Sequence, residues 1–403
     1  MLHVDVVELE LALKRGVKFA HGEIDTRSQL LAIYRNLHLA GEGVDIQFER
    51  LADDLVCTGL YKLLLKMEVS VDGKKYVPGI DFTVREFNPG LKGEFKIYYI
   101  DTLNYNPDKI FADLETPEYK GAFVVCDFMF TYKHSADFKR LTSKEHSSCS
   151  GMLYTWEAPL KFYKAYGEKV REKPILWVKP SFPKGAKTIK VDMENKFLEN
   201  YECFNVIGKV EGKSHDSCYV FTAHYDHLGK LGKKTYYPGA HDNASGTATI
   251  VTLAAHYAKN QPEYDMYFIA FSGEDSNLHG SEWYVEHPLA PLSQIKYLIN
   301  LDMIADNNPL QYCEVSKEGM RGFATFEQVN AEKGYFKAMD RHEIDGNSDH
   351  WPFALKNVPC IFLMNEGGDA YKYYHTVYDT YKNHIFTNYE PIFNLVRDFV
   401  EKY

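Results

Sequence analysis

The sequence has little that could cross-link or anchor a chain. Seven cysteines stand among 403 residues, and none forms a Cys-x-x-Cys pair. Because seven is odd, at least one thiol stays unpaired, which excludes a disulfide scaffold and leaves the cellular compartment open. No apolar run is long enough to cross a membrane, and charges soon interrupt the first residues. We therefore expect no membrane-spanning segment and no signal-peptide apolar region.

The sequence also lacks charge runs, internal repeats and low-complexity tracts. Lys and Arg number 46 and Asp and Glu number 56, which gives a net charge of −10. An acidic chain is poorly suited to binding nucleic acid, where neutralisation of phosphates dominates the affinity. We expect a secreted or periplasmic protein whose signal lies outside this chain, with the cytoplasm as the alternative. No feature of the sequence sets an oligomeric state.

The length and the pattern along the chain indicate more than one domain. Residues 1–59 are expected to form an N-terminal helical part that packs on the catalytic domain, with a helix over 25–41. Residues 60–192 are expected to form a β-rich domain, and residues 193–403 the catalytic domain. Gly, Pro, Asn and Asp separate the short apolar runs of the middle part. These runs are Lys75–Val84, Phe95–Ile100, Ala122–Phe128 and Ile175–Val178.

From residue 200 onward, expected strands and helices alternate. The strands are Phe204–Val210, Cys218–Ala223, Met266–Phe271, Lys296–Leu301 and Pro359–Met364. The helices are Ala244–Ala258, Gly280–Glu286 and Pro391–Val400. This order predicts an α/β fold with a mixed, largely parallel central sheet flanked by helices, beside the second, β-rich domain.

Polar side chains able to bind metal follow these strands. Ligands of open α/β sheets bind at the carboxyl edge of the strands. Histidine combined with carboxylate suits Zn²⁺, whereas an all-carboxylate set would favour Mg²⁺ or Ca²⁺. Two metals roughly 3.5–4 Å apart can share one carboxylate. The residues in question are His224, Asp226, His227, Asp242, Glu274, Asp275, Asp302, His375 and Asp379.

Each of these elements has a plain structural interpretation when taken alone. His-x-Asp pairs are common on surfaces, and Asp242-Asn243-Ala244-Ser245 could be nothing more than a helix cap. Glu274-Asp275 could lie in a solvated loop, and Asp302 could be structural. The ordered series of strand ends is what favours a catalytic metal site.

The same motifs resemble the co-catalytic zinc aminopeptidases of peptidase clan MH. That group includes bacterial leucyl aminopeptidases and has glutamate carboxypeptidase, the transferrin receptor and glutaminyl cyclase as relatives. The resemblance covers about residues 200–403, and residues 60–192 look like the protease-associated domain of many relatives. The matching motifs are Ala-His-Tyr-Asp-His-Leu-Gly (223–229), Pro-Gly-Ala-His-Asp-Asn-Ala-Ser-Gly (238–246), Phe-Ser-Gly-Glu-Asp (271–275), Gly280-Ser281, Asn300-Leu301-Asp302-Met303, Ser348-Asp349-His350, Tyr374-His375-Thr376 and Asp379-Thr380.

The resemblance implies a role for each matching residue. Asp242 would bridge two zinc ions. His224 and Asp302 would complete one site, and Asp275 and His375 the other. The catalytic residues implied are Glu274 as general base, Asp226 as the partner that orients His224, and Tyr374 as a hydrogen-bond donor to the oxyanion, with Tyr373 as its competitor.

One position departs from the family pattern. Many relatives have Glu-Glu where this chain has Glu274-Asp275, and aspartate is one methylene shorter. The geometry or affinity of the second metal site is therefore expected to differ. His227, His241, His279 and His350 match no ligand position of the family.

The resemblance implies a di-zinc exopeptidase that removes N-terminal residues from peptides. A carboxypeptidase of the glutamate carboxypeptidase type would need an Arg cluster near its pocket, and no Arg lies between 172 and 320. The first domain, Arg321 or Arg341 could still supply one. Glutaminyl cyclase uses one zinc, and a non-catalytic protein of the transferrin-receptor type should lack ligands. The complete set of five ligands disfavours both.

Overall fold

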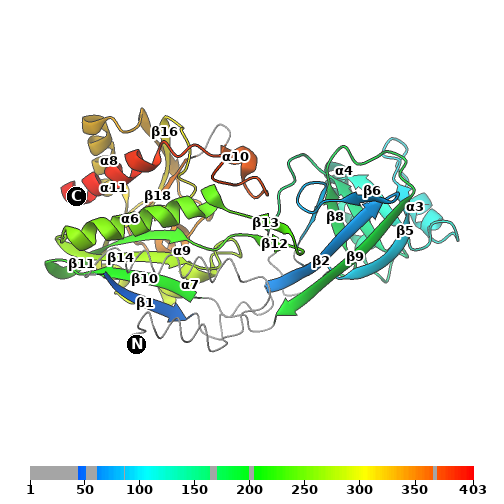
Figure 1. The fold of residues 1–403 in the computed structure, drawn as a ribbon, viewed down its shortest axis with the longest axis horizontal. Coiled ribbons are helices and arrows are strands. Elements are labelled where there is room, and N and C mark those ends of the chain that lie inside the picture. The colour runs from blue at the N-terminus through cyan, green and yellow to red at the C-terminus, as the bar shows by residue number, and fades with distance from the viewer. Residues whose placement is uncertain (1–43, 51–60, 86, 164–169, 199–203, 366–369) are drawn as a thin grey trace.

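The computed structural model describes residues 44–50, 61–85, 87–163, 170–198, 204–365 and 370–403. These residues form two large sheets, each with its own helices (Figure 1). The helix expected over residues 25–41 lies outside the described residues. Within the expected N-terminal part, the structure places a strand, β1 (Val44–Arg50), at the edge of the first sheet.

The first sheet has eight strands in the order β1-β10-β14-β11-β15-β18-β16-β17. Its centre is parallel, since β11 pairs in parallel with β14 and β15, and β15 pairs in parallel with β18. β10 is antiparallel to β1 and β14, and β16 is antiparallel to β18. The bounds are β10 (Phe204–Val210), β11 (Ser214–His224), β14 (Tyr264–Phe271), β15 (Ile295–Leu301), β16 (Leu310–Val315), β17 (Ala338–Glu343) and β18 (Cys360–Met364).

Helices cover both faces of this sheet (Figure 1). One face carries α6 (Ser245–Lys259), α8 (Met320–Lys333) and α11 (Tyr389–Lys402), and the other carries α7 (His279–Glu286) and α9 (His350–Leu355). Successive residues of β11 alternate between the two cores, so that Phe221 packs with the first group and Val220 with the second. This alternation explains why the central strands are apolar throughout. The expected mixed α/β fold is confirmed.

The second sheet has eight strands in the order β3-β2-β9-β5-β6-β7-β8-β4. The three pairs that join β5, β6, β7 and β8 are parallel, and the remaining pairs are antiparallel. The strands are β2 (Tyr61–Val71), β3 (Lys74–Tyr76), β4 (Phe82–Val84), β5 (Leu91–Tyr99), β6 (Phe123–Asp127), β7 (Gly151–Thr155), β8 (Ile175–Val178) and β9 (Thr188–Leu198). β9 continues past the boundary expected after residue 192, because it pairs with β2 as far as Leu198.

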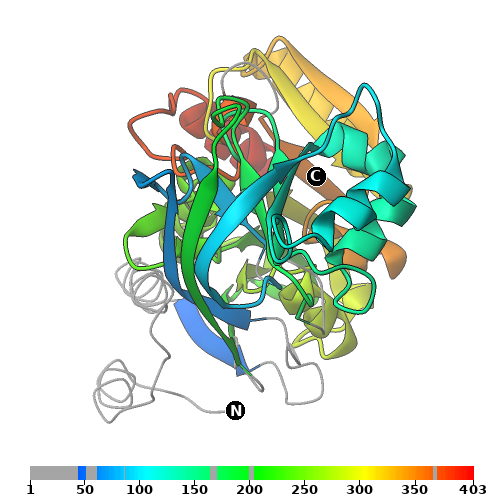
Figure 2. The same ribbon diagram turned by 90° about the vertical axis from the view of Figure 1, so that its right-hand side faces the viewer.

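Three short helices gather on one side of the second sheet (Figure 2). They are α3 (Pro107–Leu114), α4 (Phe128–Lys133) and α5 (Ser135–Thr142). Asn106 and Asp127 cap α3 and α4, since each side chain accepts a hydrogen bond from a backbone N–H of the first turn. The four β-rich runs predicted from the sequence overlap β3, β4, β5, β6 and β8, but β2, β7 and β9 were not predicted. The three helices were not predicted either, and they are only six to eight residues long.

A hairpin joins the two parts. Strands β12 (Gly229–Leu231) and β13 (Thr235–Tyr237) follow the first histidine motif and reach toward the second sheet (Figure 1). Leu228, Leu231 and Tyr237 pack into the apolar core of that sheet, together with Phe162. The part of the chain that carries the expected metal ligands and the second sheet therefore share buried apolar surface.

The structure also bears on membrane-spanning helices and on disulfides. Within the described ranges, no helix has the length and apolar character needed to cross a bilayer. The five cysteines that these ranges contain are buried and unpaired.

Candidate metal centre

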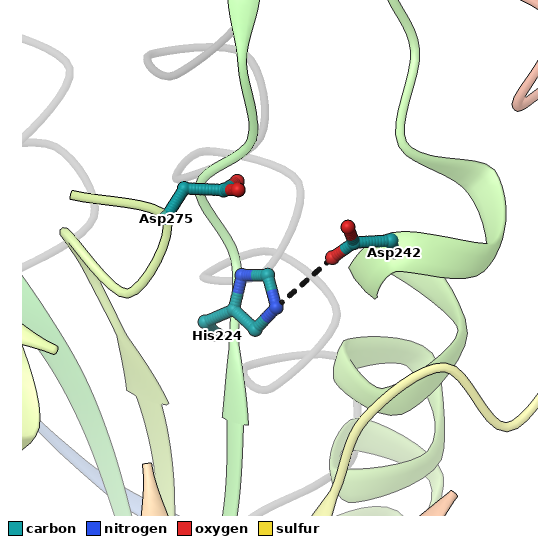
Figure 3. Close-up of side chains that lie close together, drawn as sticks. All are labelled: His224, Asp242 and Asp275. Carbon is teal, nitrogen blue, oxygen red and sulfur yellow. Dashed lines mark ion pairs between the residues drawn. The ribbon is translucent and has the colours of Figure 1, made fainter. Parts of the chain in front are cut away.

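The side chains that follow the parallel strands meet at one edge of the first sheet. β11 ends at His224, and the loops after β14 and β15 carry Asp275 and Asp302. Figure 3 shows His224, Asp242 and Asp275 directed toward one small volume. This convergence follows from the parallel pairing of β14, β11 and β15, which aligns their carboxyl ends.

Asp242 lies at the centre of the group, with its two carboxylate oxygens turned to different histidines. Its Oδ1 is 3.2 Å from Nε2 of His224, and its Oδ2 is 3.1 Å from Nε2 of His375. Nε2 of His224 is also 3.3 Å from Oδ1 of Asp302, and Nε2 of His375 is 3.3 Å from Oδ1 of Asp275. The structure thus arranges all five expected ligands as two pairs joined by Asp242.

The short turn that carries Asp242 is fixed by Asp379. This buried carboxylate accepts the backbone N–H of His241 at 2.8 Å and that of Asp242 at 3.1 Å. Nε2 of His384 lies 2.9 Å from the same carboxylate. Gly246 lets the turn approach β15, because a Cβ there would lie 2.1 Å from the carbonyl oxygen of Leu301. The position of Asp242 is therefore set from both sides of the turn.

A chain of buried hydrogen bonds orients Asp302. Ser348 donates from Oγ to Oδ2 of Asp302 at 2.7 Å. Asn300 donates to Ser348 at 2.9 Å and accepts from Thr222 at 2.7 Å. Because Oδ2 is bound in this way, Oδ1 of Asp302 is left facing His224. Ser348 stands in a motif quoted from the sequence, but sequence reasoning gave it no role.

The partner that orients His224 is a backbone group. Nδ1 of His224 lies 2.9 Å from the carbonyl oxygen of Asp226. The nearest carboxylate oxygen of Asp226 lies 3.7 Å from Nδ1, too far for a hydrogen bond. That same oxygen, Oδ1, accepts the backbone N–H of Glu274 at 3.2 Å. In the structure, Asp226 therefore orients His224 through its main-chain carbonyl group and fixes the Glu274 loop through its carboxylate.

Burial and charge shift the proton affinities of the cluster. Burial raises the pKa of Glu274 well above its ordinary value, and the carboxylates of Asp302 and Asp275 raise it further against the effect of His224. Burial opposes protonation of His375, but hydrogen bonds to Asp242 and Asp275 raise its pKa to about 9. Such shifts are typical of functional sites, because several charges share a space from which water is excluded.

Two buried atoms indicate that a cation fits this cluster. Nε2 of His224 and Oδ1 of Asp302 have no hydrogen-bond partner among the described residues, although they face each other. Leaving such polar atoms buried and unpaired is costly. Imidazole nitrogen together with carboxylate oxygen is a donor set suited to Zn²⁺. His224 and Asp302, together with the nearby carboxylate of Asp242, thus fit a metal ion.

The neighbouring residues Tyr373 and Tyr374 have different surroundings in the structure. The ring of Tyr374 stacks on His375 with centroids 3.7 Å apart. Burial, then the charges of Asp242, Asp275 and Glu274, raise the pKa of Tyr374 well above its ordinary value. The ring of Tyr373 instead lies against His384, with centroids 5.7 Å apart. Of the two, Tyr374 is placed to meet a group bound at the cluster.

Two further residues contact the cluster that sequence reasoning left without a role. Nδ1 of His227 lies 3.1 Å from Oδ2 of Asp275. Tyr163, from the part of the chain that carries the second sheet, packs edge-on against His375 with ring centroids 4.8 Å apart. The spacing of His227 to His224 was a usable signal, whereas Tyr163 carries no local signal because only tertiary packing brings it here.

Fold and cluster define a class of protein. It is a mixed α/β protein with imidazoles and carboxylates suited to divalent metal at the carboxyl edge of its sheet. Residues 205–400 match the family described as peptidase family M28. This part of the chain belongs to peptidase family M28.

Two relatives match shorter stretches of the chain. Aminopeptidase YwaD of Bacillus subtilis is 28% identical over 195 residues, which are 46% of this chain and 41% of that protein. A protein of Pyrenophora tritici-repentis described as a probable zinc metalloprotease is 30% identical over 148 residues, 36% of this chain and 30% of its own. The chain therefore matches less than half the length of either relative.

A solved structure extends the likeness of fold to nearly the whole chain. The structure of a zinc aminopeptidase from Bacillus subtilis has a TM-score of 0.66 and 18% sequence identity. The alignment covers 94% of this chain and 89% of that one. At this identity the likeness concerns the fold alone, and it includes the second sheet.

Proposed function

We propose that this protein is a zinc-dependent aminopeptidase that holds two zinc ions and removes single residues from free peptide N-termini. The observation that carries the proposal is the carboxylate of Asp242. Its two oxygens face two different histidines, and each histidine also faces a further carboxylate. One carboxylate shared between two sites of this kind is the arrangement expected for a two-metal hydrolase.

The five side chains would hold the two ions in two sets. His224, Asp302 and one oxygen of Asp242 would form the first site. His375, Asp275 and the other oxygen of Asp242 would form the second. When bound, zinc polarises the substrate carbonyl as a Lewis acid and lowers the pKa of water. The names of relatives that refer to zinc support this choice of metal.

The surroundings of Glu274 support a role in proton transfer. Its Oε2 lies 3.8 Å from Nε2 of His224, and its backbone N–H is fixed by Asp226. We propose that Glu274 takes a proton from the attacking water and passes it to the amine that leaves, as base and then as acid. Tyr374 would donate a hydrogen bond to the oxyanion that forms on the former carbonyl oxygen.

Metal content and substrate polarity test the proposal together. Protein purified without chelator should contain about two zinc ions per chain. It should release chromophore from aminoacyl substrates with free N-termini, lose activity with chelator and regain it with zinc. A reproducible zinc content near zero, without activation by zinc or cobalt, would refute the proposed metal site. Equal rates on acetylated and free peptides would refute the aminopeptidase assignment but not the metal site.

One observation favours carboxypeptidase action as a second candidate. The guanidinium of Arg85 lies over the ring of Tyr163, 4.5 Å from its centroid, and Tyr163 packs on His375. The ammonium of Lys161 lies 5.3 Å from the ring centroid of Tyr374. These cations could bind a substrate carboxylate. Release of C-terminal acidic residues from N-acylated peptides would support this function and contradict the first.

Two further assignments stay predictions. We propose that the second sheet and its helices form a protease-associated domain. We also propose secretion or periplasmic export, which fractionation of the host cell would test.

A further inference from the structure

We propose that His227 is a positioning residue for the second metal site: Nδ1–H donates to Oδ2 of Asp275 and turns Oδ1 toward the metal. This inference rests on the proposed function, because it takes Asp242, Asp275 and His375 as that site. It addresses the one position where the chain departs from its family pattern, the shorter carboxylate at residue 275.

The contacts of Asp275 divide between its two oxygens. Oδ1 lies 3.3 Å from Nε2 of His375, on the side of the metal site. Oδ2 lies 3.1 Å from Nδ1 of His227, and Nδ1 is 3.7 Å from the nearest oxygen of Asp242. An unprotonated Nδ1 would set its lone pair against the carboxylate, so the contact with Asp275 requires the Nδ1–H tautomer.

The place of the His227 ring is itself fixed. Its side chain is 4% exposed, and Nε2 is buried without a hydrogen-bond partner among the described residues. The ring lies close to Gly239, where a Cβ would lie 2.7 Å from Cγ of His227. Gly239 also adopts the left-handed backbone, with a φ of +67°. A glycine here thus admits the ring to its place beside Asp275.

A positioning role fits the site better than a role as a fourth ligand. Asp242, Asp275 and His375 already supply three protein donors, and a catalytic zinc site keeps one position open. A ligand through Nδ1 would also leave an N–H group buried at Nε2 without an acceptor, which is costly. The Nδ1–H tautomer leaves only an unfilled acceptor there. Aspartate is one methylene shorter than the glutamate of the family pattern, so Asp275 depends more on its orientation to face the metal site.

Two amide substitutions separate these roles. In His227→Asn the side-chain amide N–H takes the place of Nδ1–H, while His227→Gln presents its amide farther out. The affinity of the second zinc site, measured by competition with a chromophoric chelator, should fall about 10–100-fold in His227→Gln and His227→Ala. It should stay within about threefold of wild type in His227→Asn, within the scatter usual for such effects. The thermal midpoint of each metal-free variant reports any general loss of structure.

The controls separate this inference from the proposed function. His256→Ala removes a partly buried histidine on α6 that contacts Tyr257 and Phe393, and it should leave both zinc affinities unchanged. In an Asp275→Glu background, His227→Ala should cost less zinc affinity than in wild type, because the longer side chain no longer depends on its partner. If wild type binds no zinc, the proposed function fails.

Two other results overturn the inference alone. If wild type binds two zinc ions and His227→Ala binds them equally tightly, His227 positions nothing. If His227→Asn loses the second zinc as fully as His227→Ala, His227 is a ligand and not a positioning residue, because a neutral amide nitrogen does not replace imidazole at zinc.

Discussion

Glu274 and Asp275 are neighbours in sequence, yet the structure gives them separate surroundings. Glu274 lies near His224, whereas Asp275 lies between His375 and His227. Burial raises the pKa of Glu274, which suits a group that must accept and return a proton near neutral pH. Asp275 instead faces two imidazoles, which suits its proposed role as a metal ligand. At the scale of residues, one peptide bond separates the two proposed roles.

Substitution of these neighbours should separate rate from metal content. Glu274→Gln keeps the shape of the side chain but cannot accept a proton, so kcat should fall by roughly 10²–10⁴ with two zinc ions retained. Asp275→Asn removes an anionic donor, so zinc content should fall toward one per chain and added metal should restore part of the activity. Elemental analysis and steady-state kinetics measure both. The reverse pattern, with zinc lost from Glu274→Gln only, would exchange the two roles.

At the scale of elements, a buried network ties β16 to the loop before α9. Glu314 on β16 accepts the backbone N–H of Asp345 and the side-chain amide of Asn347, each at 2.7 Å. Nε2 of His350 lies 3.2 Å from the same carboxylate. Ser348, in the middle of this loop, hydrogen bonds Asp302. Strand β16, which carries none of the proposed ligands, thus holds the loop that orients Asp302, a proposed metal ligand.

The stability effect of Glu314→Gln should depend on pH. Burial would raise the pKa of Glu314, but the hydrogen bonds and charge of His350 and the N–H of Asp345 outweigh it, so the folded pKa lies below 4.5. The stabilisation is therefore complete above about pH 4.5 and is lost as the pH falls through the folded pKa. Glu314→Gln should lower the free energy of unfolding by about 1–3 kcal/mol at pH 7.

Chemical denaturation at several pH values measures this difference. It should shrink below about pH 4.5, where the carboxylate of the unfolded chain takes up its proton. Glu318→Gln, at an exposed position before α8, is the matched control and should change little at any pH. A destabilisation of the same size at pH 3.5 and pH 7 would show that the charge of Glu314 is not involved.

At the scale of the whole molecule, the chain beside the second sheet reaches the metal centre. The N–H of Phe162 donates to the carbonyl oxygen of His375 at 2.8 Å. Phe162 also stacks on Tyr237 of the β12–β13 hairpin, with ring centroids 5.0 Å apart. The next residue, Tyr163, packs on His375. We therefore expect the second part of the molecule to limit the length of peptide that reaches the metals.

Removal of the Tyr163 ring tests this expectation. Tyr163→Ala should reduce the preference for short over long peptides by about 2–10-fold in kcat/KM, the scale of 0.5–1.5 kcal/mol for an aromatic pair. Zinc content should stay unchanged, because Tyr163 is not one of the proposed zinc ligands. Tyr132→Ala, on the exposed side of α4, is the matched control. An unchanged length profile in a folded Tyr163→Ala variant would refute the expectation.

The sequence by itself determined five of the eight strands of the first sheet, without β1, β16 and β17, and the residues at the edge of that sheet. The apolar strand Phe204–Val210 has the bounds predicted for it, and the expected helix Ala244–Ala258 is displaced by one residue at each end. Such elements can be predicted because strand and helix periods are local, and parallel strands necessarily align their carboxyl ends. The positions of His224, Asp242, Asp275, Asp302 and His375 along the chain followed from the same local pattern.

Only the tertiary structure decided which atoms face one another. It turned the two oxygens of Asp242 to different histidines and gave His224 a backbone carbonyl as its partner. It brought His227 to Asp275 and Tyr163 to His375. These contacts join residues up to 212 positions apart, from 163 to 375, with no shared periodicity. Non-local contacts of this kind are set by packing of the whole chain, which no local window of the sequence contains.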